Sequence, residues 1–117
     1  MLTARTLRVG ELIQQELMRL IQREMHDPRV GFATVTEVRM TADLRTARVY
    51  VSVLGAEEVQ NESIAALQHA AGYLRTELSH ALRLRRAPEL HFVLDQSIEK
   101  SIRVEQLLHP EDKGEIS

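Results

Sequence analysis

The side chains in this sequence best suited to recognising a ligand are its arginines, which make up thirteen of the fifteen basic residues. A guanidinium is planar and donates paired hydrogen bonds, so it grips phosphate in two places and stacks on bases. The densest group carries only one acid, Glu77, and consists of Arg75, Arg83, Arg85 and Arg86. This pattern fits phosphate contacts, and it equally fits a solvated helix end whose cations favour the helix dipole.

A second, more dispersed set of arginines is a weaker candidate for the same chemistry. Its members are Arg5, Arg8, Arg29, Arg45 and Arg48. A general bias toward arginine would also produce such a set, so composition alone does not identify a nucleic-acid binder. Only two phenylalanines and two tyrosines occur. We therefore expect phosphate and shape contacts to dominate over base stacking.

Catalytic and metal-binding patterns are missing from the sequence. Its five histidines include no pair at i and i+4, the spacing that places two metal ligands on one helix face. The five glycines are too scattered for a phosphate-binding loop or a dinucleotide fingerprint. Without cysteine, neither a disulfide nor a thiolate metal site is possible. The sequence predicts a protein that is not an enzyme and needs no cofactor or metal.

Net charge is −2, but it is unevenly distributed. Residues 95–117 carry six acids and three bases, whereas residues 1–94 carry eleven acids and twelve bases. The body is thus about neutral and the C-terminal end acidic. Residues 1–5 show no signal peptide, and no apolar run approaches the roughly 18 residues of a membrane span. We expect a cytoplasmic protein.

Residues 4–25 are predicted to form an amphipathic helix, because apolar side chains recur on one arc at about 100° per residue. The predicted core stripe consists of Val9, Leu12, Ile13, Leu17 and Leu20. Pro28 ends the helix, since proline disfavours the α conformation in the residue before it. Beside the stripe runs a flank without acids, made of Arg8, Gln15, Arg19 and Gln22. This flank is either solvated or a surface for phosphates.

The rest of the chain alternates between strand and helix patterns. Residues 33–40 and 47–54 are predicted strands, and the short polar loop between them makes the pair antiparallel. Residues 58–83 have helical periodicity, and residues 90–94 form a third strand that can pair in parallel after this long crossover. A short helix that Ser97 can cap is expected next, and from His109 the composition is that of a flexible tail.

A set of short strings, taken in order, resembles the ribosome-binding factor A family across residues 5–108. The N-terminal strings are Arg8-Val9, Asp27-Pro28-Arg29-Val30, Thr36-Glu37-Val38, Thr41-Ala42-Asp43-Leu44 and Ala47-Arg48-Val49-Tyr50-Val51-Ser52-Val53-Leu54-Gly55. The C-terminal strings are Ala70-Ala71-Gly72-Tyr73-Leu74-Arg75, Leu82-Arg83-Leu84-Arg85-Arg86-Ala87-Pro88-Glu89-Leu90, Phe92-Val93-Leu94-Asp95-Gln96-Ser97-Ile98 and Arg103-Val104-Glu105-Gln106-Leu107-Leu108. Each string alone is weak evidence, but their order and the length of the chain make the match strong.

The resemblance implies an α+β, type II KH-like fold in the order α-β-β-α(kink)α-β, with a three-stranded sheet backed by helices. A typical KH domain clamps nucleic acid with a Gly-x-x-Gly loop, which this sequence lacks. The family instead has a helix kink, matched here by Ala70, Ala71 and Gly72. The apolar stripe alone favours one continuous helix, because it runs through Gly72 unbroken. We expect one RNA-binding domain over residues 1–108, ending in a short helix, and a flexible acidic tail over residues 109–117.

The resemblance also implies a function. Members of the family bind the free 30S ribosomal subunit and its 16S rRNA late in assembly, and they support rRNA processing and growth in the cold. It further implies release by a ribosome-associated GTPase, and we expect a monomer that contacts no membrane. The alternative is a KH-like module that binds protein. The two readings differ in salt dependence, because affinity for phosphates falls steeply as salt rises.

Overall fold

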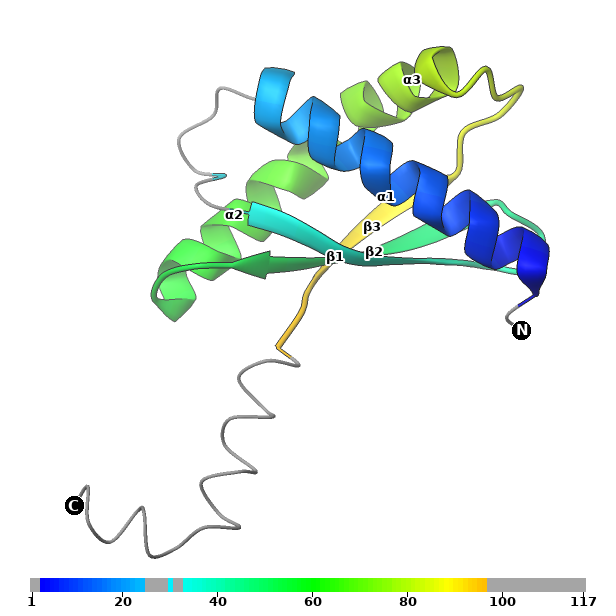
Figure 1. The fold of residues 1–117 in the computed structure, drawn as a ribbon. Helices are drawn as coiled ribbons and strands as arrows, with labels where there is room; N and C mark the ends of the chain where they lie inside the picture. Colours follow the sequence, from blue (N-terminus) through cyan, green and yellow to red (C-terminus); the bar gives the residue numbers. More distant parts are fainter. Residues whose placement is uncertain (1–2, 25–29, 31–32, 97–117) are drawn as a thin grey trace, which may run out of the picture.

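The computed structural model describes residues 3–24, 30 and 33–96, which fold into three helices and one sheet (Figure 1). The elements, in order, are α1 (Ala4–Glu24), β1 (Ala33–Met40), β2 (Thr46–Val53), α2 (Glu57–His69), α3 (Ala71–Ala81) and β3 (Glu89–Leu94). Within the sheet the strand order is β1-β2-β3, with β1 antiparallel and β3 parallel to β2. This confirms the predicted α+β fold, the element order and the pairing of all three strands.

Within the described residues, helices cover one face of the sheet and leave the other uncovered, as Figure 1 shows. Along β2, Ala47, Val49 and Val51 are fully buried, while the residues between them are exposed or half-buried. In β3, Leu90 and Phe92 are buried against the helices. Alternate residues of a strand point to opposite faces, so this pattern leaves the second face open to solvent.

A β-bulge in β1 keeps the apolar residues on both sides of it facing the core. Val35 pairs with Val51 and Glu37 pairs with Tyr50, so Thr36 is an extra residue on the β1 side. The bulge changes the parity of the strand, which allows Val35 and Val38 to point inward although they are three positions apart. The Thr36 hydroxyl donates a hydrogen bond of 2.5 Å to Asp95, beyond the end of β3.

Helix α1 packs on β1 through a face slightly different from the predicted one. The helix begins after Thr3, where the side chains of Thr3 and Thr6 each accept a hydrogen bond from the other's backbone N–H. Its buried apolar residues are Ile13, Leu17, Leu20 and Ile21. The prediction that Leu12 belongs to the core is wrong, because Leu12 is 47% exposed. It lies about 100° around the helix from Ile13, on the side away from Ile21.

The predicted helix break is present and lies at Ala70, between α2 and α3. The Ala70 N–H donates to both Ala66 O and Leu67 O at 3.1 Å, while its own carbonyl accepts from the Leu74 N–H at 2.9 Å. The chain therefore changes direction without losing these backbone hydrogen bonds. Beyond the break, α3 ends at Ala81, two residues earlier than predicted.

Helix side chains satisfy backbone groups on both outer edges of the sheet. The Gln68 side chain accepts from the Phe92 N–H at 2.9 Å and donates to Leu90 O at 3.0 Å, so it occupies the free edge of β3. At the β1 edge, the Gln14 side chain donates to Val35 O and Thr36 O at 3.1 and 3.2 Å. Edge strands with unpaired backbone groups invite pairing with another chain, and these contacts reduce that risk.

Some predicted features lie outside the described residues. They are Asp27 to Arg29, the short helix that follows Ser97, and the acidic tail over residues 109–117.

The approach of α1 to β1 gives a stability prediction for Gly10. A Cβ at this position would lie 2.6 Å from Val38 O. Helix propensity alone favours alanine over glycine by about 1 kcal/mol, but overpacking a well-packed contact typically costs about 1–3 kcal/mol. We expect Gly10→Ala to lower the free energy of unfolding by roughly 1 kcal/mol, measured by chemical denaturation.

Gly72 is the matched control for this substitution, because it too is helical but a Cβ there would meet nothing within 4 Å. We expect Gly72→Ala to raise the free energy of unfolding by roughly 0.5–1 kcal/mol, the propensity gain alone. Stabilisation by both substitutions would show that α1 does not approach β1 this closely.

Candidate nucleic-acid interface

The loop between β1 and β2 is held in shape by Asp43. Its carboxylate accepts hydrogen bonds from the Thr41 hydroxyl at 2.7 Å and from the Arg45 N–H at 3.1 Å. These bonds, with the Thr41 hydroxyl the larger cause, lower the pKa of Asp43 below its usual value. Leu44 has a φ of 61°, which turns the chain sharply and leaves its side chain packed against the core. The loop thus presents Arg45, which is exposed, at one end of the sheet.

Helix α3 ends in a Schellman motif at Arg83. The Leu84 N–H donates to Ser79 O at 3.0 Å and the Arg83 N–H donates to His80 O at 3.4 Å. Arg83 occupies the left-handed position of this motif, with a φ of 52°, where glycine is the usual residue because it has no Cβ. The side chain of Arg83 is exposed, so burial does not offset the backbone strain.

A backbone hydrogen bond joins the segment after α3 to the β1–β2 loop. The Glu89 N–H donates to Arg45 O at 2.8 Å, where β3 begins beside β2. Arg85 and Arg86 precede this point and are exposed, while Pro88 is buried. The bond therefore brings the strongest predicted candidates near the hairpin, about forty residues away in sequence.

Four predicted arginines line one groove of about 390 Å³ at this end of the molecule. They are Arg5, Arg45, Arg85 and Arg86. Apolar side chains form much of the remaining wall, and Asp43 is the one carboxylate among the described residues that line it. Because the loop itself engages the Asp43 carboxylate, the groove presents mainly cations. We call it the arginine groove.

The other predicted arginines lie elsewhere. Arg8 is exposed on α1, and Arg48 is exposed on the open face of the sheet. Arg75 donates through Nε to Ala87 O at 3.0 Å, which fastens α3 to the segment before β3. Arg29 lies outside the described residues. The prediction that this flank of α1 carries no acid is wrong, because Glu16 pairs with Arg19.

Sequence reasoning missed Arg39 as a candidate. It lies in β1 directly opposite Arg48 in the register and is exposed on the open face of the sheet. The alternation of residues 37–40 places it outward, and the hairpin loop sets its register opposite Arg48.

Within the described residues, neither a cluster of candidate metal ligands nor a membrane-spanning helix is found. In residues 3–24, 30 and 33–96, no three histidine, aspartate or glutamate side chains gather closely enough to hold a metal ion. Over the same residues, no helix has both the length and the hydropathy required to cross a bilayer.

Comparison with known proteins agrees with the family resemblance found in the sequence. The family model described as ribosome-binding factor A matches residues 5–108. A ribosome-binding factor A of Heliobacterium modesticaldum is 51% identical over 104 residues, which are 89% of this chain and 86% of the relative.

Solved structures resemble the fold as well. A candidate ribosome binding factor A of Thermotoga maritima, solved by NMR in solution, has a TM-score of 0.70 and 38% identity, covering 77% of this chain and 86% of its own. A Thermus thermophilus ribosome binding factor A, as a homology model fitted into a cryo-EM map of a 30S complex, has a TM-score of 0.64 and 31% identity. That match covers 74% of this chain and 91% of the fitted one.

The strained backbone of Arg83 yields a prediction that separates backbone from side-chain effects. Glycine adopts a positive φ at little cost, whereas a left-handed conformation costs an L-residue about 1 kcal/mol or more. We expect Arg83→Gly to raise the free energy of unfolding by roughly 1 kcal/mol relative to Arg83→Ala, which removes the same charge but keeps the strain. Equal stability of the two variants in urea denaturation would argue against the strain.

Proposed function

Because this chain belongs to the ribosome-binding factor A family, we propose that it binds the free 30S subunit through 16S rRNA late in the assembly of that subunit. The observation that carries the proposal is the similarity to the Thermus thermophilus relative that was fitted into the map of a 30S complex. The family is named for binding and not for a reaction, which agrees with a non-enzymatic factor.

The arginine groove is the surface that we propose for the rRNA contact. Guanidinium groups from α1, from the β1–β2 loop and from the segment before β3 surround one depression. Phosphates are the ligands that such a set prefers, because each guanidinium offers two parallel hydrogen bonds. Arg5 lies in α1, whereas Arg45, Arg85 and Arg86 lie in connecting segments that the bond from the Glu89 N–H to Arg45 O holds together.

Binding alone is sufficient for a maturation factor. A protein that binds an immature arrangement of the rRNA more tightly than the mature one shifts the population toward the immature form, without making or breaking bonds. We propose that this chain acts in this way until processing is complete, that it supports growth in the cold, and that a ribosome-associated GTPase releases it. We further infer that the RNA-binding domain extends to residue 108 and that the acidic tail lies outside it.

Co-sedimentation tests the choice of partner. We expect the protein to pellet with purified free 30S subunits and not with assembled 70S ribosomes, and to lose affinity as salt rises because phosphate contacts release bound counterions. Equal recovery with 30S and 70S particles would contradict the assembly role. Binding to 30S subunits without salt dependence would favour the alternative, a KH-like module that contacts ribosomal protein.

Paired arginine variants test the proposed surface. We expect Arg85→Gln with Arg86→Gln to weaken 30S binding about tenfold or more, because each charged hydrogen bond contributes about 1.5–3 kcal/mol. The plot of log affinity against log salt should flatten by about one unit of slope for each lost phosphate contact.

The control is Arg23→Gln, compared with Arg85→Gln alone, because it removes one charge from an exposed position near the C-terminal end of α1. The control should bind as the unmodified protein does. If the two single variants lose affinity equally, general charge would explain binding and the arginine groove would not be the contact surface.

A further inference from the structure

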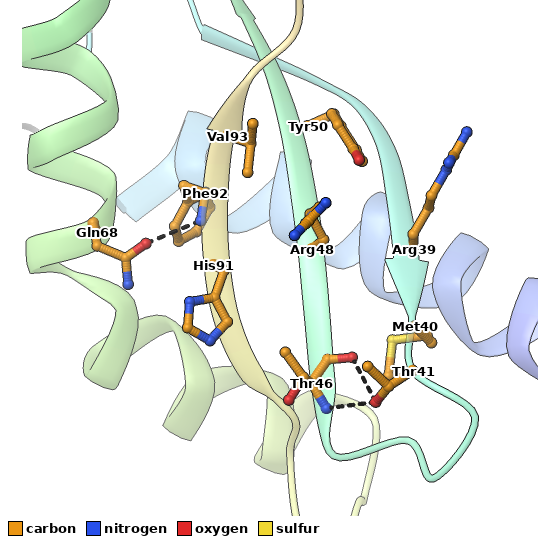
Figure 2. Close-up of a pocket in the computed structure, with 10 residues that line it drawn as sticks. All are labelled: Arg39, Met40, Thr41, Thr46, Arg48, Tyr50, Gln68, His91, Phe92 and Val93. Atoms are coloured by element: carbon orange, nitrogen blue, oxygen red, sulfur yellow. Dashed lines mark hydrogen bonds between the residues drawn. The ribbon is translucent and has the colours of Figure 1, made fainter.

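The open face of the sheet carries a second groove of about 660 Å³ (Figure 2). Apart from Met40, its lining residues differ from those of the arginine groove. The residues that line it are Arg39, Met40, Thr41, Thr46, Arg48, Tyr50, Gln68, His91, Phe92 and Val93. Among the described residues that line this groove, two are arginines, one is a histidine and none is a carboxylate.

Three basic side chains form a row across the three strands. Arg39 pairs with Arg48, and Arg48 pairs with His91, so the three stand side by side in register, as Figure 2 shows. Neighbouring strands lie about 4.8 Å apart, and like charges directly opposite each other on a sheet are destabilising. Arg39 and Arg48 are such a pair, so an anion placed over them would offset their repulsion.

An aromatic ring lies one step along the strands from this row. Tyr50 is half-buried and pairs with Val93, so the ring is supported from one side by the strand beside it. The guanidinium carbon of Arg39 lies over the ring, 5.7 Å from its centre. Because the Arg39 side chain is exposed, a nucleotide base can take its place on the ring face while the phosphates meet the neighbouring cations.

Two acids lie at the margins of the groove, beside Arg39 and His91. Glu37 pairs with Arg39, and Glu89 lies 3.6 Å from His91. All four side chains are at least half exposed, and such surface pairs contribute little to stability. A phosphate can therefore replace the Glu37 and Glu89 carboxylates at a small cost in free energy. Arg48 lies in the middle of the row, between Arg39 and His91.

We propose that this open sheet face binds an unpaired RNA segment, with a base stacked on Tyr50 and phosphates over the row formed by Arg39, Arg48 and His91. The inference rests on the proposed function, since it assigns a second contact to the same RNA partner. Met40 borders both grooves, so an RNA strand crossing the sheet continues around the β1–β2 loop into the arginine groove. An RNA duplex does not fit this surface, because its bases are already stacked on each other.

Fluorescence anisotropy with a short labelled oligouridine tests the stacking contact on the full chain. We expect Tyr50→Ala to weaken binding about fivefold or more, because the loss of one base–aromatic stack has an effect of at least this size. Tyr50→Phe keeps the ring and should bind as the unmodified protein does. Equal affinity of the Tyr50→Ala variant and the unmodified protein overturns the inference, as does an equal loss by both variants.

Arg48→Thr supplies a second readout that misfolding does not imitate. Removing the central charge of the row should leave the melting temperature unchanged or higher, while affinity for the oligouridine falls and its salt slope flattens by about 0.7. Arg23→Gln, an equal change of charge on α1, should alter neither. A fall in melting temperature without a change in affinity or salt slope counts against the inference.

Two controls separate this inference from the proposed function. If the unmodified protein pellets with free 30S subunits while the Tyr50 and Arg48 variants bind oligouridine normally, only the open-face contact fails. If the unmodified protein does not pellet with 30S subunits, the proposed function itself fails. NMR signals of the sheet residues that shift with protein concentration in the absence of RNA would show a second copy on this face, and would overturn the RNA assignment.

Discussion

A three-stranded sheet has only one interior strand, and in this fold the backbone groups of the two outer strands need partners from elsewhere. Gln68 serves the free edge of β3 and Gln14 serves that of β1, so one side chain from α2 and one from α1 take over part of the role of a fourth and a fifth strand. Both helices must then lie on the same face of the sheet and near its margins. The buried residues of β2 face these helices, and the opposite face is left for solvent or for a partner.

This one-sided packing also determines where the charged segments meet. Because β3 is parallel to β2, the chain must return through α2 and α3 to the end of the sheet at which β2 begins. The bond from the Glu89 N–H to Arg45 O fixes that return beside the hairpin loop. Residues separated by about forty positions thus line one groove together with the first turns of α1. The arginine groove is a consequence of the topology, and no local motif encodes it.

Much of the fold could be predicted from the sequence, because the spacing of apolar residues that marks a helix or a strand is a local property. The helices, the strands and the antiparallel hairpin follow from spacings of three to four or of two residues. The helix break at Ala70 was accessible only through the family resemblance, since the apolar stripe continues through it. The bulge at Thr36, which allows both Val35 and Val38 to face the core, depends on both strands at once. The Schellman motif was concealed because an arginine stands where a glycine would have indicated it.

The candidate surfaces share a property that the core does not have, a local conflict with the rules that stabilise a fold. Arg83 keeps a left-handed backbone that glycine would adopt more easily, and Arg39 and Arg48 stand as like charges in register. Both features lower stability in the free protein, and neither is offset by burial of the side chains concerned. A strained or repulsive arrangement that persists on an otherwise consistent fold indicates a role in binding, because a ligand can supply the missing interaction. For the opposed arginines that ligand must carry negative charge, and the repeating phosphates of RNA place many such charges along one strand. The repulsion between Arg39 and Arg48 therefore favours an anionic partner on physical grounds that do not depend on the family.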